Sequence, residues 1–217
     1  MEDIIIIGAG GFGREVKCLI EEINNYSDHK KFNILGFLDD AIEEGTPIQN
    51  LKVLGNIEYL KTLSEKPSLV FGLSTPIIKR KIFKELRDYN FPIIIHPKVS
   101  LKGYNIKLGK GCIICQGTIF TCDIIISDFV TINLYCTVGH DVFIGKYSSL
   151  MPSVNTSGEV IIGEGVFIGT GAAIVNQMNI GAGTIIGAGA VVSNSLPNNC
   201  TAVGVPARPI KYHNDNE

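Results

Sequence analysis

The first part of the chain alternates between short apolar runs and stretches with helical spacing. Four runs rich in Ile, Val, Leu and Phe predict buried strands, at residues 4–7, 32–38, 68–72 and 93–95. Two amphipathic helices are predicted between them, at residues 14–24 and 76–89. The second helix is expected to bury Ile77, Ile78, Ile82, Phe83 and Leu86. Strands that alternate with helices predict a parallel sheet that binds ligands at the carboxyl ends of its strands.

The rest of the chain follows a period of six. Every sixth residue from Leu108 to Val192 is large and apolar in fourteen of fifteen cases, and Thr156 is the exception. The next position is mostly Gly or small and polar, and the position four after the apolar one is mostly Val or Ala. A helix repeats about every 3.6 residues and a plain strand every two, so neither explains the pattern. A period of six predicts a parallel β-helix, with a local distortion or loop expected around Thr156.

Charge is balanced over the chain but unevenly distributed. The 217 residues include 19 basic and 21 acidic ones, a net charge of −2 that gives no reason to expect nucleic acid or an anionic membrane as a partner. Residues 99–217 hold only 6 basic and 7 acidic residues but 16 of the 24 Gly, which predicts two domains, residues 1–95 and residues 96–217. The apolar runs are too short to span a bilayer, and the first residues lack the basic start of a signal peptide, so a cytoplasmic location is expected.

The six cysteines are expected to remain thiols. Cys112 and Cys115 have C-x-x-C spacing, but the sequence lacks the second pair or the strand-to-helix context that a zinc or redox site needs. Cys112 falls in the same column of the repeat as Val130, which is typical of a small core residue. No metal site is therefore expected.

The first predicted strand runs directly into the glycine loop Gly8-Ala-Gly-Gly-Phe-Gly13, which opens a helix. The backbone of such a loop approaches a phosphate, and the helix N-terminus favours its negative charge. Asp39 and Asp40 end the second strand, where a carboxylate can bind a ribose or a base, and Gly72 ends the third. A tight turn without a ligand is the alternative. A dinucleotide oxidoreductase is less well matched, because about 95 residues suffice for only half of a six-stranded dinucleotide fold.

His140 is the candidate catalytic residue. It is the only one of the four histidines that lies within the repeat, where a polar residue interrupts an apolar scaffold. An imidazole can accept a proton from an attacking amine near neutral pH. Asp141 can orient the ring only if the two residues occupy a corner, because adjacent residues of a strand face opposite ways. An exposed, hydrogen-bonded histidine without a catalytic role is the alternative.

Together these motifs resemble the hexapeptide acyltransferases. The hexads, the tail Val203-Gly-Val-Pro-Ala-Arg208, the glycine loop and Phe37-Leu-Asp-Asp40 are similar to one branch, the bacterial nucleotide-aminosugar N-acetyltransferases that make bacillosamine- and perosamine-type sugars. The resemblance implies an α/β, Rossmann-like N-terminal domain followed by a left-handed parallel β-helix with three hexads per coil, or about five coils. It also implies a homotrimer that binds coenzyme A between neighbouring subunits.

The resemblance further implies an activity and its residues. The expected reaction is acetyl-CoA-dependent N-acetylation of a nucleotide-linked 4-aminosugar, with His140 as general base, Asp141 as its partner and no covalent intermediate. The positions matching the family's substrate contacts are Gly10, Gly11, Phe12, Asp39, Asp40, Gly72 and Asn133. Those matching its acyl-CoA contacts are Ser149, Thr170 and Ala188, although many members have a histidine where this chain has Ser149. O-acetylation of a sialic acid or related sugar and a non-catalytic nucleotide-sugar-binding or scaffold protein are the two alternatives.

Overall fold

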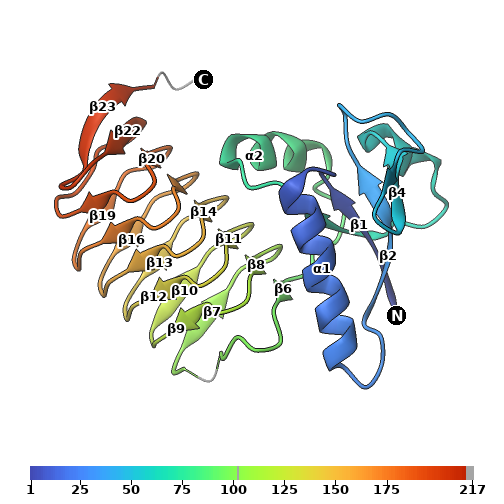
Figure 1. Cartoon of the computed structure of the whole chain (residues 1–217), viewed down its shortest axis with the longest axis horizontal. Coiled ribbons are helices and arrows are strands. Elements are labelled where there is room, and N and C mark those ends of the chain that lie inside the picture. Colours follow the sequence, from blue (N-terminus) through green and yellow to red (C-terminus); the bar gives the residue numbers. More distant parts are fainter. Residues whose placement is uncertain (102, 214–217) are drawn as a thin grey trace.

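The computed structural model describes residues 1–101 and 103–213, which form two parts that lie side by side (Figure 1). The N-terminal part contains a five-stranded sheet of order β3-β4-β2-β1-β5. Its strands are β1 (Glu2–Ile7), β2 (Phe32–Leu38), β3 (Pro47–Ile48), β4 (Leu51–Gly55) and β5 (Ser68–Phe71). Its helices are α1 (Gly11–Tyr26), the 3-10 helix η1 (Ile57–Thr62) and α2 (Pro76–Glu85).

Strand β1 lies at the centre of this sheet. It pairs in parallel with β2 on one side and β5 on the other, which confirms the predicted parallel sheet. Ile4 and Ile6 pack against α1 on one face, whereas Ile5 and Ile7 belong to the core on the α2 side. Burial of successive isoleucines on opposite faces explains why this strand reads as a continuous apolar run.

Helix α2 buries only part of the face that the apolar spacing predicts: Leu86, just after the helix, is buried, and Ile82 and Phe83 pack against the same core. Ile77 and Ile78 are 55% and 44% exposed, so their assignment to the buried face is wrong. The fully buried side chain of this helix is instead Lys79. The apolar spacing of α2 could not predict the burial of Lys79, because the hydrogen-bond acceptors of its ammonium lie on the β-helix.

The C-terminal part winds as a left-handed parallel β-helix of five coils. Its first face contains β7 (Ile106–Leu108), β10 (Ile124–Ile126), β13 (Phe143–Ile144), β16 (Ile161–Ile162) and β19 (Asn179–Ile180). Its second face contains β6 (Ile94–Ile95), β8 (Ile113–Ile114), β11 (Thr131–Ile132), β14 (Ser149–Leu150), β17 (Phe167–Ile168), β20 (Ile185–Ile186), β22 (Cys200–Val203) and β23 (Arg208–Tyr212). Its third face contains β9 (Ile119–Phe120), β12 (Thr137–Val138), β15 (Asn155–Thr156), β18 (Ala173–Ile174) and β21 (Val191–Val192).

The strand register confirms the hexad arithmetic. Ile126 pairs with Leu108 and Ile144 pairs with Ile126, so one coil takes 18 residues, or three hexads. All members of the apolar column except Leu108 are buried. Thr156 is buried as well, in the regular strand β15 between Val138 and Ile174, so the distortion expected there is wrong. A threonine is close enough in shape to valine to occupy an inward position without disturbing the coil.

The join between the two parts also differs from the prediction. Residues 93–95 were expected to complete the N-terminal sheet, but Ile94 and Ile95 pair with β8 and begin the second face of the β-helix. Ile95 lies opposite Ile114 and packs against the stacked core of the coils, whereas Ile94 lies opposite Ile113 and packs with it in the core beneath α1. A short apolar run is compatible with either sheet, and only its neighbours decide between them.

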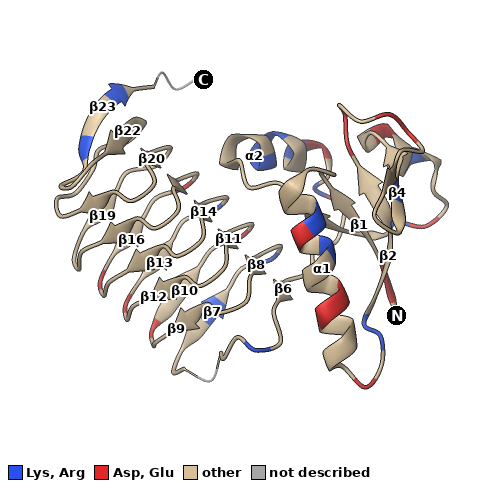
Figure 2. Cartoon of the chain, in the orientation of Figure 1, with Lys and Arg blue, Asp and Glu red and all other residues tan. Residues whose placement is uncertain are grey.

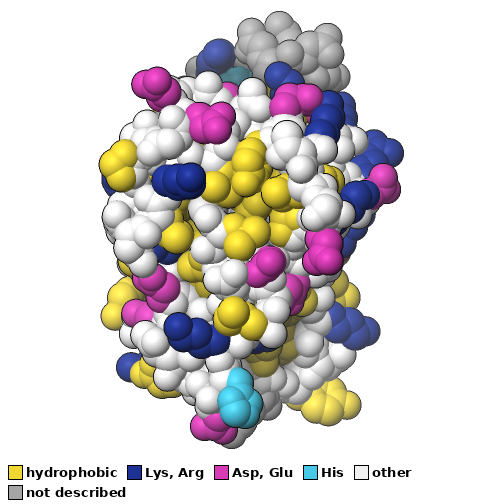
Figure 3. Space-filling model, turned by 90° about the vertical axis from the view of Figure 1, so that its right-hand side faces the viewer, with side chains coloured by type: hydrophobic (Ala, Val, Ile, Leu, Met, Phe, Trp, Pro, Cys, Tyr) yellow, Lys and Arg dark blue, Asp and Glu magenta, His cyan; other side chains and the backbone are white. Residues whose placement is uncertain are grey.

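Charged side chains gather on the N-terminal part and are sparse on the coils (Figure 2). On the side of the molecule that faces the viewer in Figure 3, basic and acidic side chains surround a central group of hydrophobic ones. Among the described residues, none of the helices has the length and apolar character needed to cross a membrane.

Candidate active site

The glycine loop joins β1 to α1 by a close packing of backbone. Gly8 has a φ of +102°, in the left-handed region that favours glycine. A Cβ on Gly13 would lie 2.0 Å from the Gly8 carbonyl oxygen, so the turn requires glycine there too. Gly10 and Gly11 are exposed, and no side chain of the described residues caps the N-terminus of α1. The first amide groups of the helix are therefore available to an anionic ligand such as a phosphate.

Asp39 supports this loop from the end of β2. Its carboxylate accepts hydrogen bonds from the backbone amides of Ala9 and Ala41, each at 2.9 Å. Asp40 is exposed next to it. Gly72 closes the loop from the end of β5, because a Cβ there would lie 2.7 Å from the Gly8 carbonyl oxygen. The structure thus brings Gly10, Gly11, Phe12, Asp39, Asp40 and Gly72 together at one edge of the sheet, as predicted. Their binding roles stay predictions.

Two clefts open at this edge, and both are large enough for parts of a nucleotide-sugar. The first, of about 620 Å³, is lined by Asp39, Asp40, Asn56 and Tyr59 among others. The second, of about 390 Å³, runs from Gly11 along α1 to the β-helix residues Gln116 and Leu134. The glycine loop therefore faces the β-helix across the second cleft.

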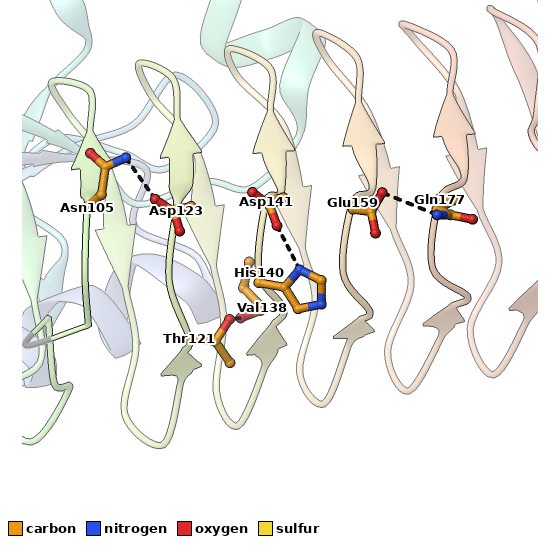
Figure 4. Close-up of polar contacts among 8 residues, drawn as sticks. All are labelled: Asn105, Thr121, Asp123, Val138, His140, Asp141, Glu159 and Gln177. Atoms are coloured by element: carbon orange, nitrogen blue, oxygen red, sulfur yellow. Dashed lines mark hydrogen bonds and ion pairs between the residues drawn. The ribbon is translucent and has the colours of Figure 1, made fainter.

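His140 and Asp141 occupy a corner of the β-helix, between the third face and the first. Asp141 has a φ of +58°, which turns its side chain to the same side as that of His140 (Figure 4). His140 Nδ1 lies 2.8 Å from Asp141 Oδ2, and both side chains are more than half exposed. An ionised carboxylate can only accept, so Nδ1 donates and Nε2 keeps a free electron pair. The corner geometry that the pairing needs is present.

A ladder of polar residues runs along the same corner at intervals of 18 residues. Asn105 donates to Asp123 at 3.0 Å, and Gln177 donates to Glu159 at 3.2 Å, each across one coil (Figure 4). Asp141 is the middle member of this column, yet it bonds to His140. Asp123, Asp141 and Glu159 are successive carboxylates that cannot donate hydrogen bonds to one another when ionised, and Asp141 accepts instead from the His140 ring.

Gly158 lies beneath the His140 ring and was not predicted from the sequence. A Cβ at Gly158 would lie 2.4 Å from His140 Nε2 and 2.5 Å from Cε1. The residue stands one coil, or 18 positions, after His140, and Glu159 beside it donates its backbone amide to the His140 carbonyl at 2.8 Å. The coil period gives the signal that could have found it, because a glycine one coil after the only histidine of the repeat leaves room for an imidazole.

The remaining predicted residues lie elsewhere on the β-helix. Asn133, Thr170 and Ala188 lie at the corner between the second and third faces, after β11, β17 and β20. One whole face separates this corner from His140, a distance on the order of 15–20 Å at about 3.3 Å per residue. Ser149 is fully buried on the second face, where its hydroxyl accepts from Lys79 at 2.9 Å. A contact between Ser149 and an acyl carrier stays a prediction to which this geometry gives no support.

Three buried cysteines of the β-helix, Cys112, Cys115 and Cys136, are not activated as nucleophiles or metal ligands. Burial raises the pKa of the Cys112 and Cys136 thiols to about 11 and that of Cys115 to about 12. These thiols are therefore protonated at neutral pH, whereas the thiolate is the reactive form. In residues 1–101 and 103–213 there is no cluster of three His, Cys, Asp or Glu side chains that could hold a metal ion.

A phosphate-type glycine loop on the same chain as a hexapeptide β-helix with a His–Asp pair defines a sugar acyltransferase. Residues 3–86 match the family described as the PglD N-terminal domain. Over 173 residues the chain is 32% identical to a GDP-perosamine N-acetyltransferase of Escherichia coli O157:H7, which covers 78% of this chain and 76% of that protein. The chain belongs to the hexapeptide-repeat sugar N-acetyltransferase family.

Solved structures extend this likeness over nearly the whole chain. The acetyltransferase domain of PglB from Neisseria gonorrhoeae, in complex with acetyl coenzyme A, has a TM-score of 0.83 and 29% identity, and the match covers 96% of this chain and 99% of that one. PerB from Caulobacter crescentus, in complex with CoA and GDP-perosamine, has a TM-score of 0.85 and 27% identity, with coverage of 97% and 98%. The resemblance read from the motifs is confirmed at the level of family and fold.

Proposed function

We propose that this chain transfers the acetyl group of acetyl-CoA to the amino group of a nucleotide-linked 4-aminosugar. The observation that carries the proposal is the His140–Asp141 pair on a β-helix that faces a glycine loop. The GDP-perosamine named for two relatives supports the substrate class, and the acetyl coenzyme A named for a third supports the donor. Both substrates are metabolites of the cytoplasm, where we place the protein on that ground.

His140 is the general base of the proposed reaction. Its Nε2 takes a proton from the amine while the amine nitrogen attacks the thioester carbonyl, so that a C–N bond forms as the C–S bond breaks. Asp141 accepts a hydrogen bond from the Nδ1–H group and stabilises the charged imidazolium. His140 then returns the proton to the departing sulfur. The acyl group passes directly between substrates, without a covalent enzyme intermediate.

The two domains divide the binding between them in this proposal. Residues 1–95 hold the nucleotide, with the diphosphate at Gly10 and Gly11, the ribose or base near Asp40, and Asp39 holding the loop in shape. The sugar extends along the cleft of about 390 Å³ toward Asn133. Residues 96–217 carry out the transfer, and Thr170 and Ala188 contact the acyl carrier at the corner between the second and third faces.

We also propose that the active enzyme is a homotrimer. His140 and the glycine loop lie at different corners of one chain, so a partner copy is needed to bring the base to the sugar. Apolar side chains at Ile125, Phe143 and Ile161 are 45%, 38% and 50% exposed in a stripe on the first face, which supports burial against a copy. Closed cyclic symmetry buries such a face without leaving an open edge. Light scattering coupled to size exclusion should give three times the chain mass, and a fully active monomer would contradict the shared site.

The acceptor class is tested with a panel of GDP-, UDP- and dTDP-linked 4-aminosugars and free sialic acid, each with acetyl-CoA. We expect an acetylated product from at least one nucleotide-linked aminosugar, with the acetyl group on nitrogen by NMR. Acetylation of a sialic acid hydroxyl alone would support the O-acetyltransferase alternative. Binding of a nucleotide-sugar without turnover, and without thermal stabilisation by coenzyme A, would indicate a binding or scaffold protein.

A further inference from the structure

A fully buried lysine connects the two domains. Lys79 projects from α2 into the second face of the β-helix, and its side chain is 0% exposed. Its ammonium donates to the Phe129 carbonyl at 2.8 Å, the Ser149 hydroxyl at 2.9 Å and the Thr131 hydroxyl at 3.2 Å. The three nearest acceptors match the three N–H groups of the ammonium, so the end of the side chain has a defined position and direction.

These acceptors come from two successive coils. Phe129 lies just before β11, and Thr131 is the first residue of that strand. Ser149 belongs to β14 of the next coil, where it lies opposite Thr131. Neighbouring coils are about 4.8 Å apart, so a slip of α2 by one coil would break all three bonds. Lys79 therefore specifies the register of the helix along the β-helix axis.

The apolar part of the same interface cannot specify that register. Phe83 of α2 contacts Phe129 with ring centroids 4.4 Å apart, and Phe129 stacks on Tyr147 at 5.3 Å. Such contacts hold the domains together but are weakly directional. At the rim, Arg80 and Glu164 are 3.6 Å apart and about half exposed, which contributes little.

Lys79 is an unfavourable choice for stability alone. No carboxylate of residues 1–101 and 103–213 lies within ion-pair distance of its ammonium, and burial lowers the pKa of Lys79 to about 7. An apolar side chain would avoid this desolvation. Unlike an apolar side chain, the lysine makes directional hydrogen bonds that define the position of α2 on the β-helix.

A short segment connects α2 to the glycine loop, so the position of the helix affects the position of the loop. Gly72, four residues before Pro76, packs against Gly8 and Gly13, and its amide donates to the Ile7 carbonyl at 2.7 Å. A shift of α2 therefore moves the loop relative to its own β-helix, and so relative to the His140 that a neighbouring copy presents in the proposed trimer. We propose that Lys79 is a positioning residue for acetyl transfer: it fixes the nucleotide-binding domain on the β-helix so that the bound acceptor meets the catalytic histidine. This inference rests on the proposed function.

The test replaces Lys79 by methionine, which keeps the length of the side chain and removes the donors. Lys81→Met, an exposed lysine of the same helix, is the matched control. Misplacement of a substrate by about 1 Å can reduce turnover by about 100-fold, so we expect Lys79→Met to lower kcat by roughly 10- to 100-fold. The Kd values for the nucleotide-sugar and for acetyl-CoA should change by no more than about threefold, because each site stays intact within its own domain. Thr131→Val, which removes only the longest of the three bonds, should lower kcat less and in the same direction.

Hydrogen exchange of residues 76–85 gives a readout that does not depend on turnover. We expect faster exchange there in Lys79→Met than in Lys81→Met, with β1 equally protected in both. A kcat within threefold of wild type in folded Lys79→Met, or a Kd that rises as much as kcat falls, would overturn the proposal. If Lys79→Met does not fold, an unchanged kcat in Thr131→Val overturns it instead. A wild-type protein that acetylates no aminosugar would refute the proposed function, and the exchange rates would then decide on Lys79 alone.

Discussion

Substitution of Gly158 by alanine tests whether the position of the His140 ring determines the rate. The added methyl group would lie 2.4 Å from Nε2 and 2.5 Å from Cε1, whereas unstrained contacts between such atoms need about 3.5–4.0 Å. The ring must therefore move by about 1 Å or more. The backbone of Gly158 is not in the left-handed region, so alanine adds little strain of its own.

A displacement of this size reaches both functional nitrogens. It changes the 2.8 Å bond between Nδ1 and Asp141 and carries Nε2 away from the acceptor amine. We expect kcat to fall by about 10- to 100-fold, with KM for acetyl-CoA unchanged, because misplacement of about 1 Å can cost that much. The melting temperature should change little, because the His140 side chain is 54% exposed and no core contact is lost.

The assay measures initial rates of acetyl transfer for wild type, Gly158→Ala, His140→Ala and the double variant. In the His140→Ala background the methyl group has no ring to displace, so Gly158→Ala should not lower the residual rate further. Equal losses in both backgrounds would show that the alanine acts on something other than the imidazole. A kcat unchanged in Gly158→Ala alone would refute the reasoning outright.

Three further predictions follow from single contacts. Thr156→Val should raise the free energy of unfolding by about 1 kcal/mol in urea denaturation, because the Thr156 hydroxyl is buried without a partner among the described residues; a loss of stability would contradict this. Asp141→Ala should lower kcat by about 10- to 100-fold and spare both Kd values, and loss of binding instead would give Asp141 a different role. Burial lowers the pKa of Lys79 to about 7, and the Cys112 thiol is its titratable neighbour. Above about pH 7 the folded protein therefore releases a proton that Lys79 of the unfolded chain retains up to about pH 10. Wild type should therefore gain stability over Lys79→Met as pH rises from 7 to 9, by at most about 1.4 kcal/mol per unit, and a flat difference would contradict the burial.

The coil architecture was predictable because it depends on a local period. One inward residue in six specifies a strand and a corner, and the pattern tolerates even Thr156 without distortion. The glycine loop and Asp39 were predictable for the same reason, since a strand and the turn after it are close in sequence. Such features need no knowledge of distant parts of the fold.

Contacts between the N-terminal part and the β-helix were not predictable in this way. The apolar spacing of α2 favoured Ile77 and Ile78 as buried residues, yet the acceptors on the second face select Lys79. The same contact buries Ser149, a position that matches an acyl-carrier contact of the family. The run at residues 93–95 was placed in the wrong sheet because its partner strand begins only at Ile113. The two errors, in α2 and at residues 93–95, each concern a partner distant in sequence, and the Ser149 contact stays a prediction.

His140 is proposed as the general base, and a comparison of wild type with His140→Ala tests this role most directly. Initial rates are measured with acetyl-CoA and the preferred nucleotide-aminosugar, together with the Kd of each substrate. Loss of a general base lowers the rate by about 10²- to 10⁴-fold, and we expect that loss in kcat with both Kd values retained. Turnover in His140→Ala equal to that of wild type would contradict the account.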